Sequence, residues 1–355
     1  MDLPVIWFAI LAILWTGFFV LEGFDFGVGI LHWFVGRNDT ERRVAINSIG
    51  PFWDANEVWL VVAAAGTFAA FPGWYATMFS SLYLALVVIL VALIFRGLAF
   101  EYRGKSENPR WRKVWSLGLV VSSVVIPLFL GIGLGDLLAG LPIGADQEYA
   151  GTFWNLFTPY GLLTGATFLS LCLLHGATFL GLKTTDLIRQ RSHRLARIFG
   201  GTSLVLGLTW VISTYLIADG VSAIAIGFLT LLVLGVAAAA TMTARERDGW
   251  AFAASAVAIG SVTGSLFASL YPNVMISSTD ASNTLTIANT ASGNYALTVM
   301  TIVAVIMFPL VLLYQGWNYY VFRQRVTTPP TEPSQAHDRG SRPEDEASAL
   351  DPGSG

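Results

Sequence analysis

The sequence predicts an all-α integral membrane protein. It has 355 residues, of which 54% are hydrophobic and only 12% charged, and its mean hydropathy is +0.63. That composition is too apolar for a water-exposed chain of this length. Its apolar runs approach or exceed the roughly 20 residues that a helix needs to cross about 30 Å of hydrocarbon. These runs are continuous rather than alternating, which argues against a transmembrane β-barrel.

Apolar runs between charged or Pro/Gly-rich breaks predict nine membrane-spanning helices. The first run lacks the basic n-region of a cleavable signal, so we expect it to be retained as a spanning helix. The turns that open the fourth and eighth helices are faintly similar (RWRKVW and RERDGW), a weak hint of two four-helix units plus one extra helix. The predicted helices are 5–34, 51–71, 76–100, 115–139, 155–181, 197–217, 221–242, 250–270 and 295–322.

These helices define the expected domain organisation. A transmembrane domain over 1–322 comprises a first unit at 5–139, a second unit at 155–270 and the ninth helix at 295–322. The tail at 323–355 is rich in Pro, Ser, Asp and Glu, so we expect it to be disordered and cytoplasmic.

The basic residues fix the orientation of the predicted helices. All 20 Lys and Arg residues lie after the odd-numbered helices or, in the case of Arg96, at the end of the third helix. Since cytoplasmic loops carry the excess of Lys and Arg, the N-terminus is predicted outside and the C-terminus in the cytoplasm. The one long outer loop, at 271–294, is rich in Ser, Thr and Asn and could cap the outer face.

Four carboxylates lie in the cytoplasmic halves of the first two helices. Glu22 and Asp25 belong to the first helix, and Asp54 and Glu57 belong to the second. Each pair is spaced by three residues, which places both acids on one helix face. Acids that share a low-dielectric site can hold and pass a proton near neutral pH. The pattern therefore suggests a proton conduit that opens to the cytoplasm.

A simpler interpretation is that these acids are solvated at the membrane boundary or neutralised by nearby arginines. Arg37, Arg42 and Arg43 are close enough in sequence to do so. We favour the conduit because ionisable residues within spanning segments are costly and usually face a bundle interior or a water-filled cavity.

The other groups that could carry chemistry suggest no metal or haem site held by this chain alone. Cys172 is the single cysteine, so there is no internal disulfide and no cysteine-based metal site. His175 is the only histidine deep in an apolar run. A lone buried histidine is more often a hydrogen-bonded core residue than a ligand, and bis-histidine haem ligation would need a second deep partner.

Several stretches resemble subunit II of cytochrome bd-type quinol oxidases, over about residues 5–322. The strings that carry the resemblance are EGFDFGVGIL (Glu22 to Leu31), GRNDTERRVAINSIGPFWDANEVWL (Gly36 to Leu60), FRGLAFEYRGK (Phe95 to Lys105) and SSTDASNTLTIANTASGNYALTVMT (Ser277 to Thr301).

The resemblance implies a heterodimer with a larger subunit I in the bacterial cell membrane. In that family subunit I holds a low-spin haem b, a high-spin haem b, haem d and the quinol site, and quinol electrons reduce dioxygen to water. Subunit II has nine helices in two four-helix bundles plus a peripheral helix. It contributes a proton supply and an oxygen route, and it can hold a structural quinone. Lipid and small accessory subunits are further candidate partners.

Carried over by position, the family's proton-path acids fall on Asp25 and Asp54, and its oxygen-tunnel tryptophan falls on Trp59. Two positions depart from some members. Glu22 stands where they have Asp, which preserves an acid, and Glu57 stands where they have Gln, which adds one.

Two other classes of function remain open on the residues alone. Carboxylates within the membrane are also typical of a proton-coupled secondary transporter, although no inverted repeat is found and the acids lie toward one side. A purely structural membrane subunit, whose acids are only solvated, is the second alternative.

Overall fold

The chain is almost entirely helical in the computed structural model, which describes residues 2–218 and 220–327. Most of the predicted tail at 323–355 lies outside the described residues. The long helices are α1 (Leu3–Val35), α3 (Trp53–Ala70), α5 (Tyr83–Tyr102), α6 (Pro109–Ala139), α7 (Pro159–Lys183), α8 (Asp186–Ile217), α9 (Ala223–Ala244), α10 (Asp248–Leu270) and α12 (Asn294–Val321). The short elements are α2 (Asp39–Ile49), α4 (Pro72–Ser81), α11 (Ile287–Thr290), β1 (Asn273–Met275), β2 (Leu285–Thr286) and three 3₁₀ turns at 103–105, 153–156 and 281–283.

Eight of these helices are long and apolar enough to cross a membrane: α1, α5, α6, α7, α8, α9, α10 and α12. The long helix α3 is the exception, because its 18 residues include Asp54, Asn56 and Glu57, which lower its hydropathy. It nevertheless runs beside α1 in the same bundle. The predicted α-helical architecture is thus confirmed, apart from the short strands β1 and β2.

The predicted helix ends differ from the observed ones where charged residues continue a helix out of the apolar region. Helix α8 begins eleven residues before the predicted 197, and α6 begins six residues before the predicted 115. Their first turns are basic and polar, so hydropathy alone assigns them to loops. The predicted helix at 76–100 is divided at Leu82 into α4 and α5, and the amphipathic α2 was not predicted.

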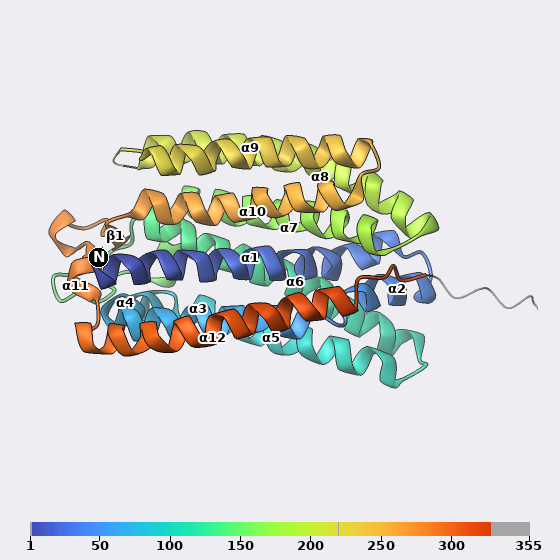
Figure 1. Ribbon diagram of the computed structural model, residues 1–355, viewed down its shortest axis with the longest axis horizontal. Coiled ribbons are helices and arrows are strands. Elements are labelled where there is room, and N and C mark those ends of the chain that lie inside the picture. Colours follow the sequence, from blue (N-terminus) through green and yellow to red (C-terminus); the bar gives the residue numbers. More distant parts are fainter. Residues whose placement is uncertain (1, 219, 328–355) are drawn as a thin grey trace, which may run out of the picture.

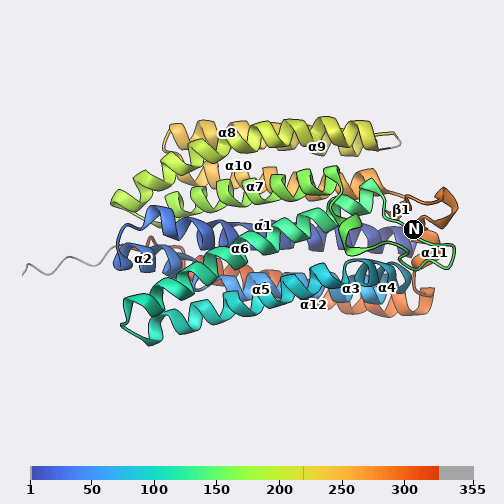
Figure 2. The same cartoon turned by 180° about the vertical axis from the view of Figure 1, so that it is seen from behind.

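Helix α1 occupies the middle of the molecule. Figures 1 and 2 show α7 and α10 on one side of it with α8 and α9 beyond them, and α3, α4, α5 and α12 on the other side. Helix α1 contacts α3, α6, α7, α10 and α12. The N-terminus and the α2 end of the bundle lie at opposite ends of the long axis.

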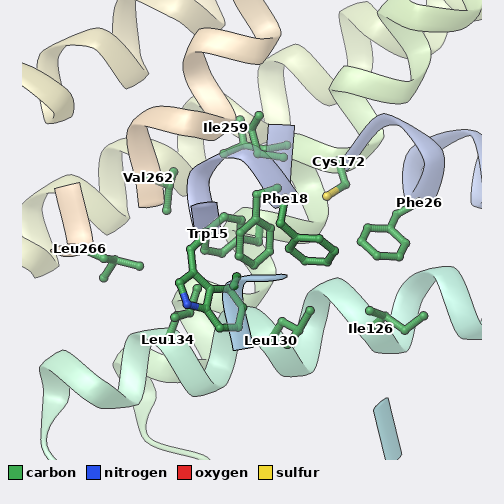
Figure 3. Close-up of a cluster of buried hydrophobic side chains, with 14 of the residues drawn as sticks. Trp15, Phe18, Phe26, Ile126, Leu130, Leu134, Cys172, Ile259, Val262 and Leu266 are labelled. Carbon is green, nitrogen blue, oxygen red and sulfur yellow. The ribbon is translucent and has the colours of Figure 1, made fainter. Parts of the chain in front are cut away.

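The core between α1, α6, α7 and α10 is formed by large apolar side chains (Figure 3). Phe18, Phe19 and Phe168 are fully buried, and the rings of Phe19 and Phe168 stack at 4.2 Å. Helices α1 and α7 cross at two glycines: a Cβ at Gly27 would overlap the Cys172 carbonyl oxygen and lie 2.8 Å from Gly176 Cα. Small residues at this crossing allow the two backbones to touch.

The loop predicted to cap the outer face folds back on the bundle. Strands β1 and β2 pair antiparallel within it. The Leu141 N–H donates to the Ile276 carbonyl at 3.0 Å, and the Ser292 N–H donates to the Ala70 carbonyl at 2.8 Å. Backbone hydrogen bonds therefore join this loop both to the α6–α7 connection and to the end of α3.

The opposite end is held by ion pairs. Asp39 of α2 binds Arg103 at 2.5 Å and Arg112 at 2.9 Å. Glu41 accepts from the Arg37 N–H at 2.7 Å and binds Arg191 of α8 at 2.6 Å. Burial acts to raise the pKa of Glu41, but these hydrogen bonds and the two arginine charges lower it below its ordinary value.

Candidate functional site

The predicted acids meet where α1, α3 and α5 pack together, in the half of the bundle nearer α2. Glu22 and Asp25 on α1 are fully buried, and Glu57 on α3 is half-buried. The three-residue spacing turns Glu22 and Asp25 toward α3 and α5, while the opposite face of α1 packs on α7 and α10. Three of the four predicted acids therefore share one buried cluster.

Arg96 of α5 is the cation of this cluster. Its side chain is fully buried and forms an ion pair with Glu22, and its Nη1 also donates to Glu57 Oε2 at 3.0 Å. Its guanidinium lies 4.8 Å from the centre of the Phe26 ring. Arg37, Arg42 and Arg43, the arginines considered from the sequence, form no ion pair with these acids among the described residues. The one basic residue within the apolar run of α5 was the signal that could have identified Arg96.

Asp25 is held through Asn56 of α3. Asn56 Nδ2 donates to Asp25 Oδ2 at 2.7 Å and to the Leu21 carbonyl at 3.0 Å. Asn56 Oδ1 accepts from Gln315 Nε2 at 2.8 Å and from the Tyr319 hydroxyl at 3.1 Å. Sequence reasoning missed all three of these polar residues. Gln315 and Tyr319 lie some 260 positions further along the chain, so no local spacing links them to Asn56.

Several buried polar atoms of the cluster have no hydrogen-bond partner within the described part of the chain. They are Asp25 Oδ1, Arg96 Nε and Nη2, and Glu22 Oε2, the carboxylate oxygen that is not in the ion pair with Arg96. Buried polar atoms are nearly always hydrogen-bonded, to protein or to ordered water. These atoms are therefore suited to bind water between Arg96 and Asp25.

Asp54 lies one turn from Glu57 on α3 but outside the buried cluster. Its side chain is exposed in the first turn of α3, and it makes no hydrogen bond or ion pair with any residue that the structure describes. The positive end of the helix dipole favours a carboxylate at this position. The chain by itself thus brings together Glu22, Asp25 and Glu57, but not Asp54.

Trp59 is buried one and a half turns further along α3. A Cβ at Gly17 of α1 would lie 2.6 Å from its ring, and the Phe308 ring of α12 lies 6.0 Å away in an edge-on arrangement. The next two residues, Leu60 and Val61, line an apolar cavity of about 560 Å³ between α1, α3, α4, α5 and α6. Trp15, Phe79 and Leu134 also line it.

Both ring nitrogens of the buried histidine, His175, are hydrogen-bonded to other protein groups. His175 Nε2 donates to the Val20 carbonyl at 3.1 Å, and Nδ1 then accepts from the Ser255 hydroxyl at 2.7 Å. Its ring stacks on Phe252 at 4.5 Å. These contacts are those of a core histidine, and they leave neither nitrogen free for iron. No group of three or more His, Cys, Asp or Glu residues suited to a metal occurs within residues 2–218 and 220–327.

A further buried acid, Asp136 of α6, lies near the other end of the bundle and was not predicted. Its Oδ1 accepts from the Thr158 hydroxyl at 2.5 Å, and Thr158 caps α7 by accepting from the Gly161 N–H at 2.9 Å. Asp136 therefore stabilises the start of α7 through Thr158. The isolated acid in the glycine-rich GIGLGD segment was the available signal.

Comparison with known proteins identifies the family. Residues 3–322 match the model of cytochrome bd terminal oxidase subunit II. Cytochrome bd ubiquinol oxidase subunit 2 of Bacillus subtilis is 42% identical over 325 residues, covering 91% of this chain and 96% of the relative. Cytochrome bd-I ubiquinol oxidase subunit 2 of Escherichia coli K12 is 36% identical over 361 residues, covering 92% and 95%.

The fold is similar to a solved one as well. A chain of the bd oxidase structure from Geobacillus thermodenitrificans superposes with a TM-score of 0.73 at 19% identity, covering 91% of this chain and 99% of that chain. Together with the match over 3–322, this means that the chain belongs to the family of cytochrome bd terminal oxidase subunit II.

Proposed function

We propose that this chain, a subunit of a terminal quinol oxidase in the bacterial plasma membrane, carries protons from the cytoplasm through the Glu22–Asp25–Glu57 cluster. The receiver is the partner subunit I, to which the haems of this cytochrome complex belong. Haem b, high-spin haem b and haem d would supply the electron transfer and oxygen chemistry there. Since dioxygen reduction to water consumes protons, uptake from the cytoplasm contributes to the proton motive force.

The observation that carries the proposal is the charge imbalance of the cluster. Three carboxylates surround a single guanidinium, that of Arg96. If all three were ionised, the cluster would hold two uncompensated negative charges, which is costly at a site removed from water. A cluster that is more stable with a bound proton can hold one within the membrane and release it to an acceptor.

Glu57 and Asp54 suggest where protons enter the path and which face of the chain meets the partner subunit. Glu57 keeps 24% of its side chain exposed, and it shares Arg96 with Glu22, so it can exchange protons with the surroundings and with the cluster. Asp54 lies one turn away on the exposed face of α3. Because an unpaired acid on a membrane-facing surface is unfavourable, we place the partner subunit against this face.

The topology proposed with this path has nine spans, an outer N-terminus and a cytoplasmic C-terminus. Helix α3 would be the ninth span, since its 18 residues cover about 27 Å. Two four-helix bundles, α1 with α3, α5 and α6 and α7 with α8, α9 and α10, would flank the peripheral α12. The complete absence of Lys and Arg from the loops assigned outside supports this orientation.

We further propose that Trp59 and the neighbouring cavity serve apolar molecules. The lining residues are almost all aliphatic or aromatic. Such a cavity fits the prenyl tail of a structural quinone, and dioxygen also partitions into apolar space. Quinone extracted from the purified complex should decrease when Ala64→Phe fills the cavity; unchanged content would contradict quinone binding there.

Substitution of Asp25 tests the proton path. Asp25→Asn keeps the shape of the side chain and can still accept from Asn56, but it cannot carry a proton. We expect quinol-driven oxygen consumption by the complex in proteoliposomes to fall at least tenfold, with haem content and subunit pairing unchanged. The matched control is Asp146→Asn, in the exposed loop after α6. Full turnover in Asp25→Asn, alone and combined with Asp54→Asn, would contradict the proton path and mean that the chain is only a structural partner.

A further inference from the structure

We infer that the half of α12 that contains Gln315 and Tyr319 positions Asp25 by fixing the orientation of Asn56. The inference rests on the proposed proton path and adds two positioning residues to it. It assigns the proton of Asp25 to one oxygen, Oδ1.

The orientation of Asn56 follows from its four hydrogen bonds. Its Oδ1 accepts from Gln315 and Tyr319, and its Nδ2 donates to Asp25 and to the Leu21 carbonyl. If the amide flipped, its oxygen would face the Leu21 carbonyl and its NH₂ would face the NH₂ of Gln315, and both contacts would be repulsive. The Leu21 carbonyl of α1 and the Gln315 donor of α12 therefore keep the amide N–H directed at Asp25.

A fixed donor decides where Asp25 takes up a proton. Oδ2 permanently accepts from Asn56 at 2.7 Å, whereas Oδ1 has no hydrogen-bond partner within the described residues. The proton therefore binds at Oδ1. The titratable and charged groups around Asp25 are Glu22 on its own helix, Arg96 of α5, Glu57 of α3 and Tyr319 of α12.

The packing of α12 supports a positioning role for this helix. Only two of its 28 residues are buried, Leu297 and Gln315. A helix that merely filled space would bury an apolar stripe, but here the buried residue next to the acids is a glutamine. Tyr319 also stacks on Phe52 at 4.7 Å, so its hydroxyl is held by a packed ring.

Polar contacts hold this end of α12 in place. Asn318 Nδ2 donates to the Pro51 carbonyl at 2.9 Å. Lys183 of α7 donates to the carbonyl of Phe322 and, at 2.7 Å, to that of Gln324. A cation at the last carbonyls of a helix is stabilising. The position of Gln315 and Tyr319 is thus set both from the turn that precedes α3 and from α7.

The other end of α12 offers a matched control. There Trp7 Nε1 of α1 donates to two groups of α12, the Thr301 hydroxyl at 3.0 Å and the Leu297 carbonyl at 3.3 Å. Thr301→Val removes one of these two bonds far from the acids, just as each variant of Gln315 or Tyr319 removes one of the two bonds from α12 to Asn56. Tyr319→Phe removes one bond to Asn56 and keeps the stacked ring, and Gln315→Leu removes the other.

The experiment compares these three variants in the purified two-subunit complex in proteoliposomes. We expect Tyr319→Phe and Gln315→Leu to lower turnover roughly two- to tenfold, the effect of one lost hydrogen bond, and to move the pH of half-maximal turnover. They should also shift the infrared carbonyl band that Asp25→Asn abolishes. Thr301→Val should change none of these quantities.

The outcomes separate the two proposals. If Asp25→Asn slows turnover but both α12 variants behave like Thr301→Val, the positioning inference is wrong and the proton path stands. If Asp25→Asn leaves turnover unchanged, the proton path itself is wrong. A variant that fails to assemble is replaced by Gln315→Met, which keeps a long, unbranched side chain but has no donor and should reproduce the altered pH profile.

Discussion

Removal of Arg96 should destabilise the protein because it leaves Glu22 without a counter-charge. The Arg96 and Glu22 side chains are both 0% exposed, whereas Glu57 is 24% exposed. Loss of one partner of a fully buried pair typically costs about 3–5 kcal/mol, against about 0–1 kcal/mol for an exposed pair. Arg96→Met, which preserves much of the apolar volume, should therefore lower the unfolding free energy by about 3–5 kcal/mol.

Double substitutions show which acid causes the loss of unfolding free energy in Arg96→Met. Arg96→Met with Glu22→Gln removes the buried charge together with its partner, so most of the stability should return. Arg96→Met with Glu57→Gln leaves Glu22 uncompensated and should recover little, because Glu57 still reaches solvent.

The assay is a denaturation series on the purified complex in detergent, with SDS as the denaturant and all variants measured side by side. The reasoning would be refuted by a loss below about 1 kcal/mol in Arg96→Met, the value for an exposed pair. It would also be refuted if Glu57→Gln rescued the variant better than Glu22→Gln does.

Three other predictions concern separate parts of the protein. Gly27→Ala should destabilise by about 1–3 kcal/mol, because its Cβ overlaps the Cys172 carbonyl oxygen, whereas Gly118→Ala, with open space around it, should be neutral or stabilising; equal thermal shifts would contradict this. His175→Gln should lower stability and leave the haem absorption spectrum unchanged, and a lost haem band would show ligation. Glu41→Gln should destabilise by about 1 kcal/mol at pH 7. Because the folded state depresses the pKa of Glu41, its stabilisation is present above the ordinary glutamate pKa and is lost as pH falls through the folded-state value, so thermal scans should converge in acid.

The sequence alone determined the class of the protein, because lipid imposes a simple rule on the chain. A spanning helix needs a long apolar run, and cytoplasmic loops are rich in basic residues. Hydropathy therefore predicts where the helices lie in the sequence, and the positions of Lys and Arg predict their orientation. The same rule fails where helices leave the membrane. It gave no signal for α2 or for the basic first turns of α8. It did predict α3, at 51–71, although Asp54, Asn56 and Glu57 lower the hydropathy of that helix.

The site was only half determined by the sequence. Spacing along one helix grouped Glu22 with Asp25 and placed Glu57 on the second helix, since a period of 3.6 residues is a local property. Only the tertiary structure decided what surrounds them. The counter-ion of Glu22 comes from α5 and the donors that orient Asn56 come from α12, while Asp54 faces outward. Contacts between distant segments depend on how helices pack and rotate, which no local periodicity encodes.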